Sequence, residues 1–241
     1  FFSEYGQRML PSQAGRTTMC PTELFFDRAN GSNYLKLLPI ETREGDLSLQ
    51  ELRRHPEHWI RHELDEDDPE TMRAVLAEVA RVRSVTPQQA RRFGFSESML
   101  EADLDNPGQV LIPSWRSAQI SIRHPLFERG LRILDTPGLN ALGSEPELTV
   151  SLLPAAHAIL FLLSADTGVT ASDMTIWKEH IDTEDADHRA GRFAVLNKID
   201  TLWDELQPEE QVQQGIDRVR HYTANQLGLK GDDVIPVSAK Q

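Results

Sequence analysis

The sequence predicts an α/β fold with a mostly parallel sheet, and the pattern of its second half indicates this. Apolar segments of strand length alternate there with amphipathic segments of helix length. Strands separated by helices form right-handed βαβ units, whose strands lie parallel in one sheet. With 241 residues, of which 39% are hydrophobic, the chain can bury the core of one large domain or two small ones.

The elements expected in the second half follow in chain order. The expected strands are 131–135, 157–165, 192–198 and 233–238, and the expected helices are 145–156, 171–181 and 208–227. The segment HAILFLLSA (157–165) is almost entirely apolar, which predicts a buried strand. Acidic residues in the first turn of 208–227 suit the helix dipole and support a long helix there.

The first half is less regular. Residues 6–27 predict a loop followed by a strand. The polar segment 44–105, rich in Arg and Glu, has a helical period, most clearly at 69–85, and predicts a helical region. Residues 115–135 predict two strands that are joined by a turn and therefore lie antiparallel.

Charge and cysteine content narrow the possible functions. The formal net charge of −13 argues against a nucleic-acid groove or a polybasic membrane patch. It does not exclude a nucleotide, because backbone N–H groups and a metal ion can hold phosphates. The single cysteine, Cys20, cannot form an internal disulfide, which favours the cytoplasm. The longest apolar run, 158–165, is far shorter than the ~18 residues of a membrane span.

The motif Asp135-Thr136-Pro137-Gly138 predicts the phosphate side of a ligand site. Its composition also fits an ordinary β-turn. Its position at the carboxyl end of a predicted strand favours the ligand site, because α/β sheets bind their ligands there. An aspartate at that point can hold Mg²⁺, and a glycine lets its N–H approach a terminal phosphate.

The motif Asn197-Lys198-Ile199-Asp200 predicts the base side. Asn and Asp are also good helix caps, which is the simpler alternative. However, a carboxylate such as Asp200 can accept two hydrogen bonds, from the N1–H and the N2 amino group of guanine. Adenine has no matching pair of donors. Asn197 can reach the O6/N7 edge, and the Lys198 stem can cover the base face.

A third motif, Ser238-Ala239-Lys240, follows the last predicted strand, where the Ala239 N–H can bond guanine O6. This tripeptide alone has no predictive value. Three motifs in this order, each at the end of a strand, predict a guanine-nucleotide site.

The three motifs resemble the third, fourth and fifth signature motifs of the translation-factor-related GTPases. Within that class, GQRMLPSQAGRTTMCPTEL (6–24) resembles the region after the P-loop in the dynamin superfamily, particularly in mitofusins and bacterial dynamin-like proteins. The resemblance implies a three-layer P-loop NTPase-like G domain, of which residues 1–241 form a part. In that domain 44–105 would be a helical insertion and 115–241 the nucleotide-binding α/β core.

The resemblance also implies the roles of individual residues. Thr18, with Thr17 as a close second, would be the switch threonine that senses Mg²⁺ and the γ-phosphate and helps to place the attacking water. β-Propensity at a strand entrance is the alternative for both threonines. Thr18 and Asp135 would hold the metal, and Gly138 would contact the γ-phosphate. The nucleotide would be bound by Asp135, Thr136, Pro137, Gly138, Asn197, Lys198, Asp200, Ser238, Ala239 and Lys240.

One family motif is missing, since the sequence contains no G-x-x-x-x-G-K-S/T and none of its lysines follows a glycine. In the family the P-loop precedes a segment like 6–11. We therefore expect this chain to be an excerpt of a larger protein whose upstream residues supply the P-loop and the central first strand. The excerpt alone would be inactive. A degenerate pseudo-GTPase is the alternative.

The expected activity is Mg²⁺-dependent hydrolysis of GTP to GDP by in-line attack of water. Leu139 stands where Ras-like enzymes place a water-orienting glutamine, so other groups must place the water. In the family these are the P-loop region, a monovalent cation and a second G domain. The resemblance thus implies a homodimer formed through the G domain and a cytoplasmic protein, peripheral at a membrane. It would remodel that membrane through segments outside this chain, with no nucleic-acid partner. A soluble ribosome-assembly-type GTPase and a non-catalytic nucleotide-dependent scaffold are the alternatives.

A histidine cluster offers a competing metal site. His58 and His62, with Glu63, would share one face of a helix and could bind zinc. The H-E-x-x-H pattern and a third ligand are both missing, so a solvated helix face is the simpler interpretation.

Overall fold

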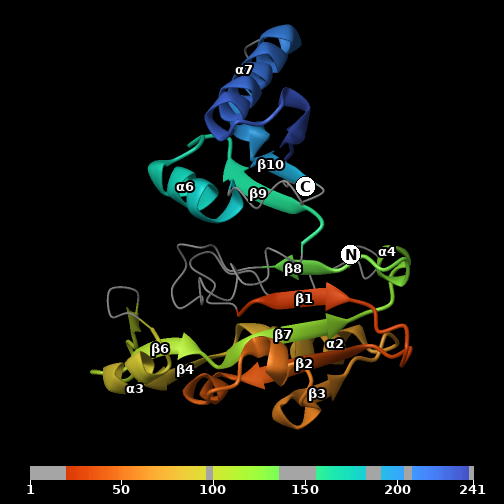
Figure 1. Ribbon diagram of the computed structural model, residues 1–241, viewed down its shortest axis with the longest axis vertical. Helices are drawn as coiled ribbons and strands as arrows, with labels where there is room; N and C mark the ends of the chain where they lie inside the picture. The colour runs from red at the N-terminus through yellow and green to blue at the C-terminus, as the bar shows by residue number, and fades with distance from the viewer. Residues whose placement is uncertain (1–19, 96–99, 136–155, 183–190, 204–207, 239–241) are drawn as a thin grey trace. The chain divides into compact units, whose positions relative to one another are not determined.

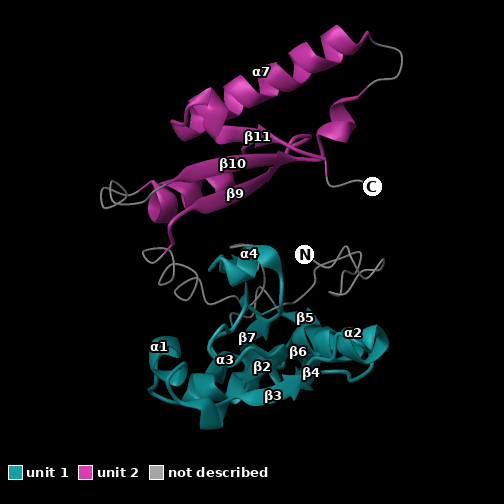
Figure 2. Cartoon of the chain, turned by 90° about the vertical axis from the view of Figure 1, so that its right-hand side faces the viewer, with its two compact units in different colours: residues 1–149 teal, residues 150–241 magenta. Residues whose placement is uncertain are grey.

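The computed structural model describes residues 20–95, 100–135, 156–182, 191–203 and 208–238. The chain divides into two compact units, residues 1–149 and residues 150–241 (Figure 2). Each unit contains its own sheet and its own hydrophobic core (Figure 1). The expected division into an insertion at 44–105 and a core at 115–241 stays a prediction.

Unit 1 is built on a five-stranded mixed sheet with the order β3-β2-β7-β1-β8. Its strands are β1 (Thr22–Phe25), β2 (Tyr34–Pro39), β3 (Ile60–Glu63), β7 (Trp115–Ser121) and β8 (Ile133–Asp135). β1 runs parallel to β7, and the other neighbouring pairs are antiparallel. Helix α2 (Pro69–Ala77) contributes Met72 and Leu76 to the core that the buried residues Leu35 and Leu37 form on one face of the sheet.

The segment 44–105 is mixed rather than helical throughout, which corrects the sequence prediction. It contains helices α1 (Leu49–Leu52), α2 and α3 (Pro87–Arg92), and also strands β3, β4 (Val82–Val85) and β5 (Glu101–Ala102). β4 and β5 flank β6 (Val110–Pro113) in a three-stranded antiparallel sheet. The helix predicted at 69–85 gives way to β4 because the β-branched Val82 and Val85 pair with β6.

The two strands expected at 115–135 form and run antiparallel, but they are not joined by a simple turn and they do not pair with each other. A short helix, α4 (Pro125–Glu128), separates the two strands, with the His124 side chain accepting a hydrogen bond at its N-cap and Pro125 as its first residue. β1 inserts between β7 and β8 and pairs with both. The strand residues were predicted, but the pairing depends on β1, which lies far away in the sequence.

Unit 2 has a three-stranded sheet with the order β11-β10-β9. Its strands are β9 (Ile159–Ser164), β10 (Arg192–Asn197) and β11 (Val234–Pro236), and both pairs are parallel, as predicted. α6 (Ala171–Ile176), which continues as a π-helical turn, and α7 (Glu209–Leu227) also form where they were predicted. The helix expected at 145–156 lies almost entirely outside the described residues. None of the helices in the described parts of the chain combines the length and apolar character of a membrane-spanning helix.

Only one face of β9 is buried, so the prediction of a buried strand is correct for alternate residues. Leu163 is 4% exposed and packs in a core with Trp177, whose indole N–H donates to the Leu227 carbonyl at 3.0 Å. Leu162, on the opposite face, is 65% exposed. Successive strand residues point to opposite faces, and the side chains of α6 and α7 pack against the face of Leu163.

We therefore predict unequal costs for two neighbouring substitutions in β9. Leu163→Ala should lower the free energy of unfolding by about 2–5 kcal/mol, because it leaves a cavity in the core. Leu162→Ala should change it by less than about 0.5 kcal/mol, because that side chain is exposed. Urea denaturation of both variants measures the difference, and equal losses would contradict the one-sided core.

Candidate functional site

The parallel sheet of unit 2 places β10 and β11 side by side, so that their ends are neighbours (Figure 2). The Val237 N–H donates to the Leu196 carbonyl at 2.8 Å, and the Ile199 N–H donates to the Val237 carbonyl at 3.2 Å. These two backbone hydrogen bonds connect the loop after β10 to the loop after β11. The fourth and fifth predicted motifs therefore share one edge of one sheet.

A side-chain hydrogen bond joins the same two motifs. The Ser238 hydroxyl donates to Asp200 Oδ1 at 2.7 Å. A carboxylate has about four lone-pair directions, so this bond orients Asp200 and leaves acceptor capacity for a ligand. The sequence predicted both residues as parts of the site, but not that Ser238 would hold the carboxylate.

Lys198 has a left-handed backbone, with φ 62° and ψ 35°. The Asn197 side chain accepts a hydrogen bond from the Lys198 N–H at 2.8 Å. The Thr201 N–H and hydroxyl both donate to the Lys198 carbonyl, at 3.0 and 2.7 Å. Such a conformation costs a non-glycine residue about 1–2 kcal/mol. Strain of this kind concentrates at functional sites. Here the left-handed conformation of Lys198 turns the chain sharply between Asn197 and Asp200.

Asp166 lies beside this site and was not predicted to belong to it. β9 pairs Ser164 with Asn197, and the Ala165 N–H donates to the Asn197 carbonyl at 2.8 Å. The Ser164 hydroxyl, with a smaller contribution from the Lys198 ammonium, holds the pKa of Asp166 below its usual range. The sequence could have indicated Asp166 by its position directly after the strand predicted at 157–165, since that strand runs parallel to β10.

On the phosphate side, the structure describes Asp135 as the last residue of β8, where it pairs with Thr22 of β1. The side chain is exposed, yet the surrounding protein removes enough water to raise the pKa of its carboxyl above the ordinary value. The role of Asp135 as a metal ligand stays a prediction.

The remaining predicted site residues lie outside the described residues. They are Thr17, Thr18, Thr136, Pro137, Gly138, Ala239 and Lys240. Asp135 belongs to unit 1, whereas Asn197, Lys198, Asp200 and Ser238 belong to unit 2. The use of both sets by one nucleotide stays a prediction.

The histidine cluster is not a metal site in the structure. His58 ends a 3₁₀ turn (Pro56–His58), while His62 and Glu63 lie on strand β3. The shared helix face that was predicted for them, whether zinc-binding or solvated, therefore does not exist. Throughout the described parts of the chain, no three His, Cys, Asp or Glu side chains are grouped to hold a metal ion.

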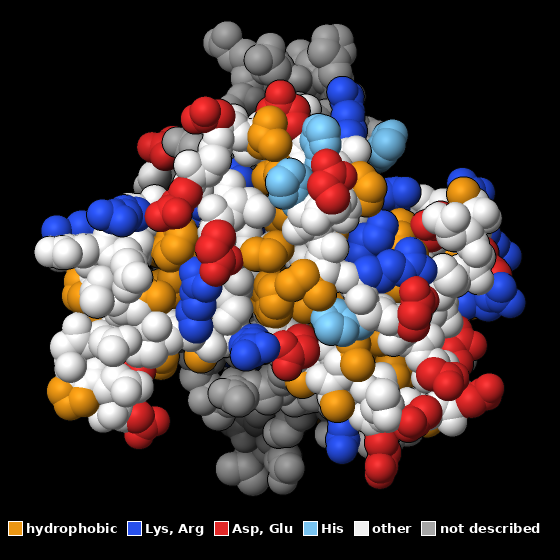
Figure 3. Space-filling view, turned by 90° about the horizontal axis from the view of Figure 1, so that it is seen from below, with side chains coloured by type: hydrophobic (Ala, Val, Ile, Leu, Met, Phe, Trp, Pro, Cys, Tyr) orange, Lys and Arg blue, Asp and Glu red, His pale blue; other side chains and the backbone are white. Residues whose placement is uncertain are grey.

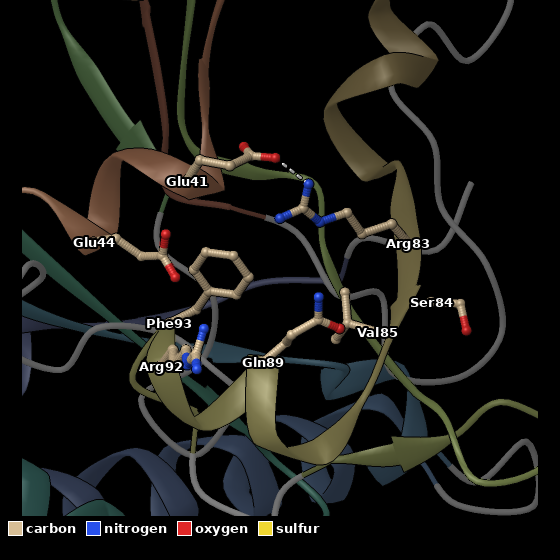
Figure 4. A pocket seen from close by; sticks show the side chains of 8 residues that line it. All are labelled: Glu41, Glu44, Arg83, Ser84, Val85, Gln89, Arg92 and Phe93. Carbon is tan, nitrogen blue, oxygen red and sulfur yellow. Dashed lines mark hydrogen bonds and ion pairs between the residues drawn. The ribbon is translucent and has the colours of Figure 1, made fainter.

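A cavity of about 430 Å³ in unit 1 is lined by side chains from 41–44 and 83–93 (Figure 4). An ion pair between Arg83 and Glu41 crosses it, and the Arg83 guanidinium lies 5.2 Å from the centre of the Phe93 ring. Of the predicted nucleotide-binding residues that the structure describes, none lines this cavity.

The strain at Lys198 yields a prediction about stability, in which two substitutions have opposite effects. Lys198→Gly should raise the free energy of unfolding by about 1 kcal/mol, because glycine adopts a positive φ without steric cost. Lys198→Val should lower it, because a β-branched residue tolerates this conformation poorly. Chemical denaturation of both variants tests the point, and an equal loss of stability in the two would refute it.

Comparisons with known proteins agree with the motifs. A family model described as "Dynamin family" matches residues 5–199. No curated protein matches the sequence. Era in complex with MgGDPNP and part of 16S ribosomal RNA is 23% identical, with a TM-score of 0.31, and the match covers 58% of this chain and 37% of Era. An Era variant from Aquifex aeolicus bound to GDP·AlF4⁻ is 24% identical, with a TM-score of 0.30, covering 51% of this chain and 35% of Era.

The chain thus spans little more than a third of the Era chains, and likenesses this weak carry no argument. The family match is different in kind, because it extends over most of the 241 residues and includes the third motif and the first three residues of the fourth. This chain belongs to the dynamin family and carries the α/β fold of its GTPase-type G domain.

Proposed function

We propose that this chain is the guanine-nucleotide-binding part of an enzyme that hydrolyses GTP to GDP and phosphate. The observation that carries the proposal is the hydrogen bond from Ser238 to Asp200, which unites two motifs on one sheet edge. A surface turn or a helix cap does not need a carboxylate oriented by a second loop. Membership of the dynamin family supports the same assignment.

The base side distinguishes guanine from adenine by the hydrogen-bond donors that each base offers. Asp200, held by Ser238, accepts from the N1–H and the N2 amino group of guanine. Adenine leaves such a carboxylate without donors, which costs affinity. Lys198 is exposed at the same edge, where its aliphatic stem can cover the base.

The phosphate side is assigned to the Asp135 loop and the switch threonine. The carboxylate of Asp135 and the hydroxyl of Thr18 are hard oxygen donors, which suit Mg²⁺. When bound, Mg²⁺ would neutralise part of the negative charge of the phosphates. Gly138 offers its N–H to the γ-phosphate, and Thr18 helps to orient the attacking water. Because Leu139 cannot orient water, we assign that task also to a monovalent cation and to a second G domain.

The biological role we propose is membrane remodelling by a cytoplasmic homodimer that binds membranes through segments outside this chain. Family membership supports this role. On the face drawn in Figure 3, acidic and basic side chains are interspersed, and the net charge is −13. Both features count against a nucleic-acid partner and thus against a ribosome-assembly role.

Phosphate release by the full-length protein tests the enzymatic part. We expect GTP-dependent release that stops with EDTA and resumes with added Mg²⁺. Turnover per subunit should rise with protein concentration, or on vesicles, because the dimer completes the site. GTP binding without release would support the non-catalytic scaffold instead. A turnover that is flat over concentration, with and without lipid, would refute the dimer.

A substitution at Asp200 tests the base assignment. Asp200→Asn should weaken GTP binding by about 10- to 100-fold, because the new amide N–H₂ faces the guanine N2 amino group. The same variant should gain affinity for xanthosine triphosphate, whose C2 oxygen accepts that N–H₂. Competition with a fluorescent nucleotide measures both changes, and Asp173→Asn is the matched control, because Asp173 serves in a helix capping box. Unchanged preference for GTP over xanthosine triphosphate would exclude Asp200 from the site.

A further inference from the structure

Glu23 is a buried carboxylate at the junction of four elements in unit 1. It lies on β1 and is 7% exposed. Its Oε1 accepts a hydrogen bond from the Arg132 guanidinium at 2.9 Å. Its Oε2 accepts from Gln119 of β7 at 3.1 Å and lies 3.1 Å from Nη2 of Arg53, the C-terminal cap of α1. One side chain thus connects β1, β7, α1 and the start of β8.

β8 has little other lateral support in the described part of unit 1. It is the last strand in the order β3-β2-β7-β1-β8, and its pairing with β1 covers three residues. That pairing places Asp135, its last residue, opposite Thr22, which directly precedes Glu23. With a ladder of only three residue pairs to β1, the position of β8 depends strongly on side-chain contacts.

Arg132, which directly precedes β8, supplies that anchor. Besides its bond to Glu23, its guanidinium lies 4.5 Å from the centre of the Phe25 ring, two residues along β1. Arg132 itself is 61% exposed, so the pair derives its strength from the buried end. A buried carboxylate without a cationic partner costs free energy, so Glu23 favours conformations in which the two arginines stay paired with it.

Arg53 brings the inserted segment into the same junction. It is 30% exposed and binds the oxygen of Glu23 that Arg132 does not use. A displacement of α1 therefore weakens or strengthens the pairing of Arg53 with Glu23. That alters how strongly Glu23 attracts Arg132, and with it the start of β8. No motif in the sequence indicates this connection, because Arg53, Gln119 and Arg132 lie far from Glu23 along the chain.

We propose that Glu23 is a positioning residue for the phosphate-sensing side of the nucleotide site. It fixes β8, and with it Asp135, against β1, the strand that follows the switch threonines. Through Arg53 it makes that position depend on the inserted segment. The proposal rests on the proposed function, because it assigns Asp135 to Mg²⁺.

Mg²⁺ dependence distinguishes positioning from a general structural role. In the full-length protein, Glu23→Gln should raise the Mg²⁺ concentration for half-maximal GTP binding by roughly 5- to 10-fold, a coupling of ordinary size. The dissociation constant for GDP in EDTA should change less than about twofold, which is a negligible difference in free energy. The reason is that Asp200 in unit 2 recognises the base, and Glu23 does not contact it. A variant that is merely less stable would lose both kinds of binding together.

Three further variants complete the experiment. Arg132→Gln should give the same shift while leaving Glu23 paired with Arg53 and Gln119, so it serves if Glu23→Gln fails to fold. Arg53→Gln should give a smaller shift in the same direction. Glu63→Gln, which removes the exposed ion pair with Arg61 on β3, is the matched control and should give none.

The outcomes separate this inference from the proposed function. If the unmodified protein binds no guanine nucleotide, both fall together. If it binds GTP in a Mg²⁺-dependent manner and neither Glu23→Gln nor Arg132→Gln shifts that dependence, the positioning role is refuted and the proposed function stands. A shift with Arg132→Gln but none with Arg53→Gln would overturn the link to the inserted segment.

Discussion

The hydrogen bond between Ser238 and Asp200 depends on one constraint, the parallel pairing of β10 with β11. Parallel strands release their following loops at the same edge, so the residues after both strands meet although 38 positions separate them in the chain. Two backbone hydrogen bonds then fix the loops, and the side-chain bond orients the carboxylate. Reversing either strand would leave Asp200 without its partner. The guanine assignment therefore follows from sheet topology as much as from the motif itself.

The phosphate side has a different physical basis. Within the described residues, Asp135 ends a three-residue strand that pairs with β1 alone, whereas Asn197 ends a strand that is paired on both sides. A short ladder fixes a strand less firmly than a long one, so side-chain contacts contribute more to its position. The Glu23 junction supplies such contacts at the start of β8.

Local sequence patterns predicted the helices and strands better than they predicted which strands pair with one another. The strands and helices of unit 2 were predictable because their signals lie within short windows: apolar runs indicate the strands, and capping residues such as Asp173 in the first turn of α6 indicate the helices. The insertion of β1 between β7 and β8 was not predictable, since it is a contact between distant segments. The strand β3 was also missed, because its polar and exposed residues lack an apolar period. Asp200 and Ser238 were predicted as site residues from their type and position. The bond between them and the proximity of Asp166 to Lys198 required the register of the sheet.

The central claim is that the edge formed by β10 and β11 recognises guanine. Calorimetric titration of the full-length protein with GTP and with ATP, at equal Mg²⁺, tests it most directly. We expect GTP to bind at least about 100-fold more tightly, because adenine leaves the oriented carboxylate without its donors. Equal affinities for the two nucleotides would contradict the account.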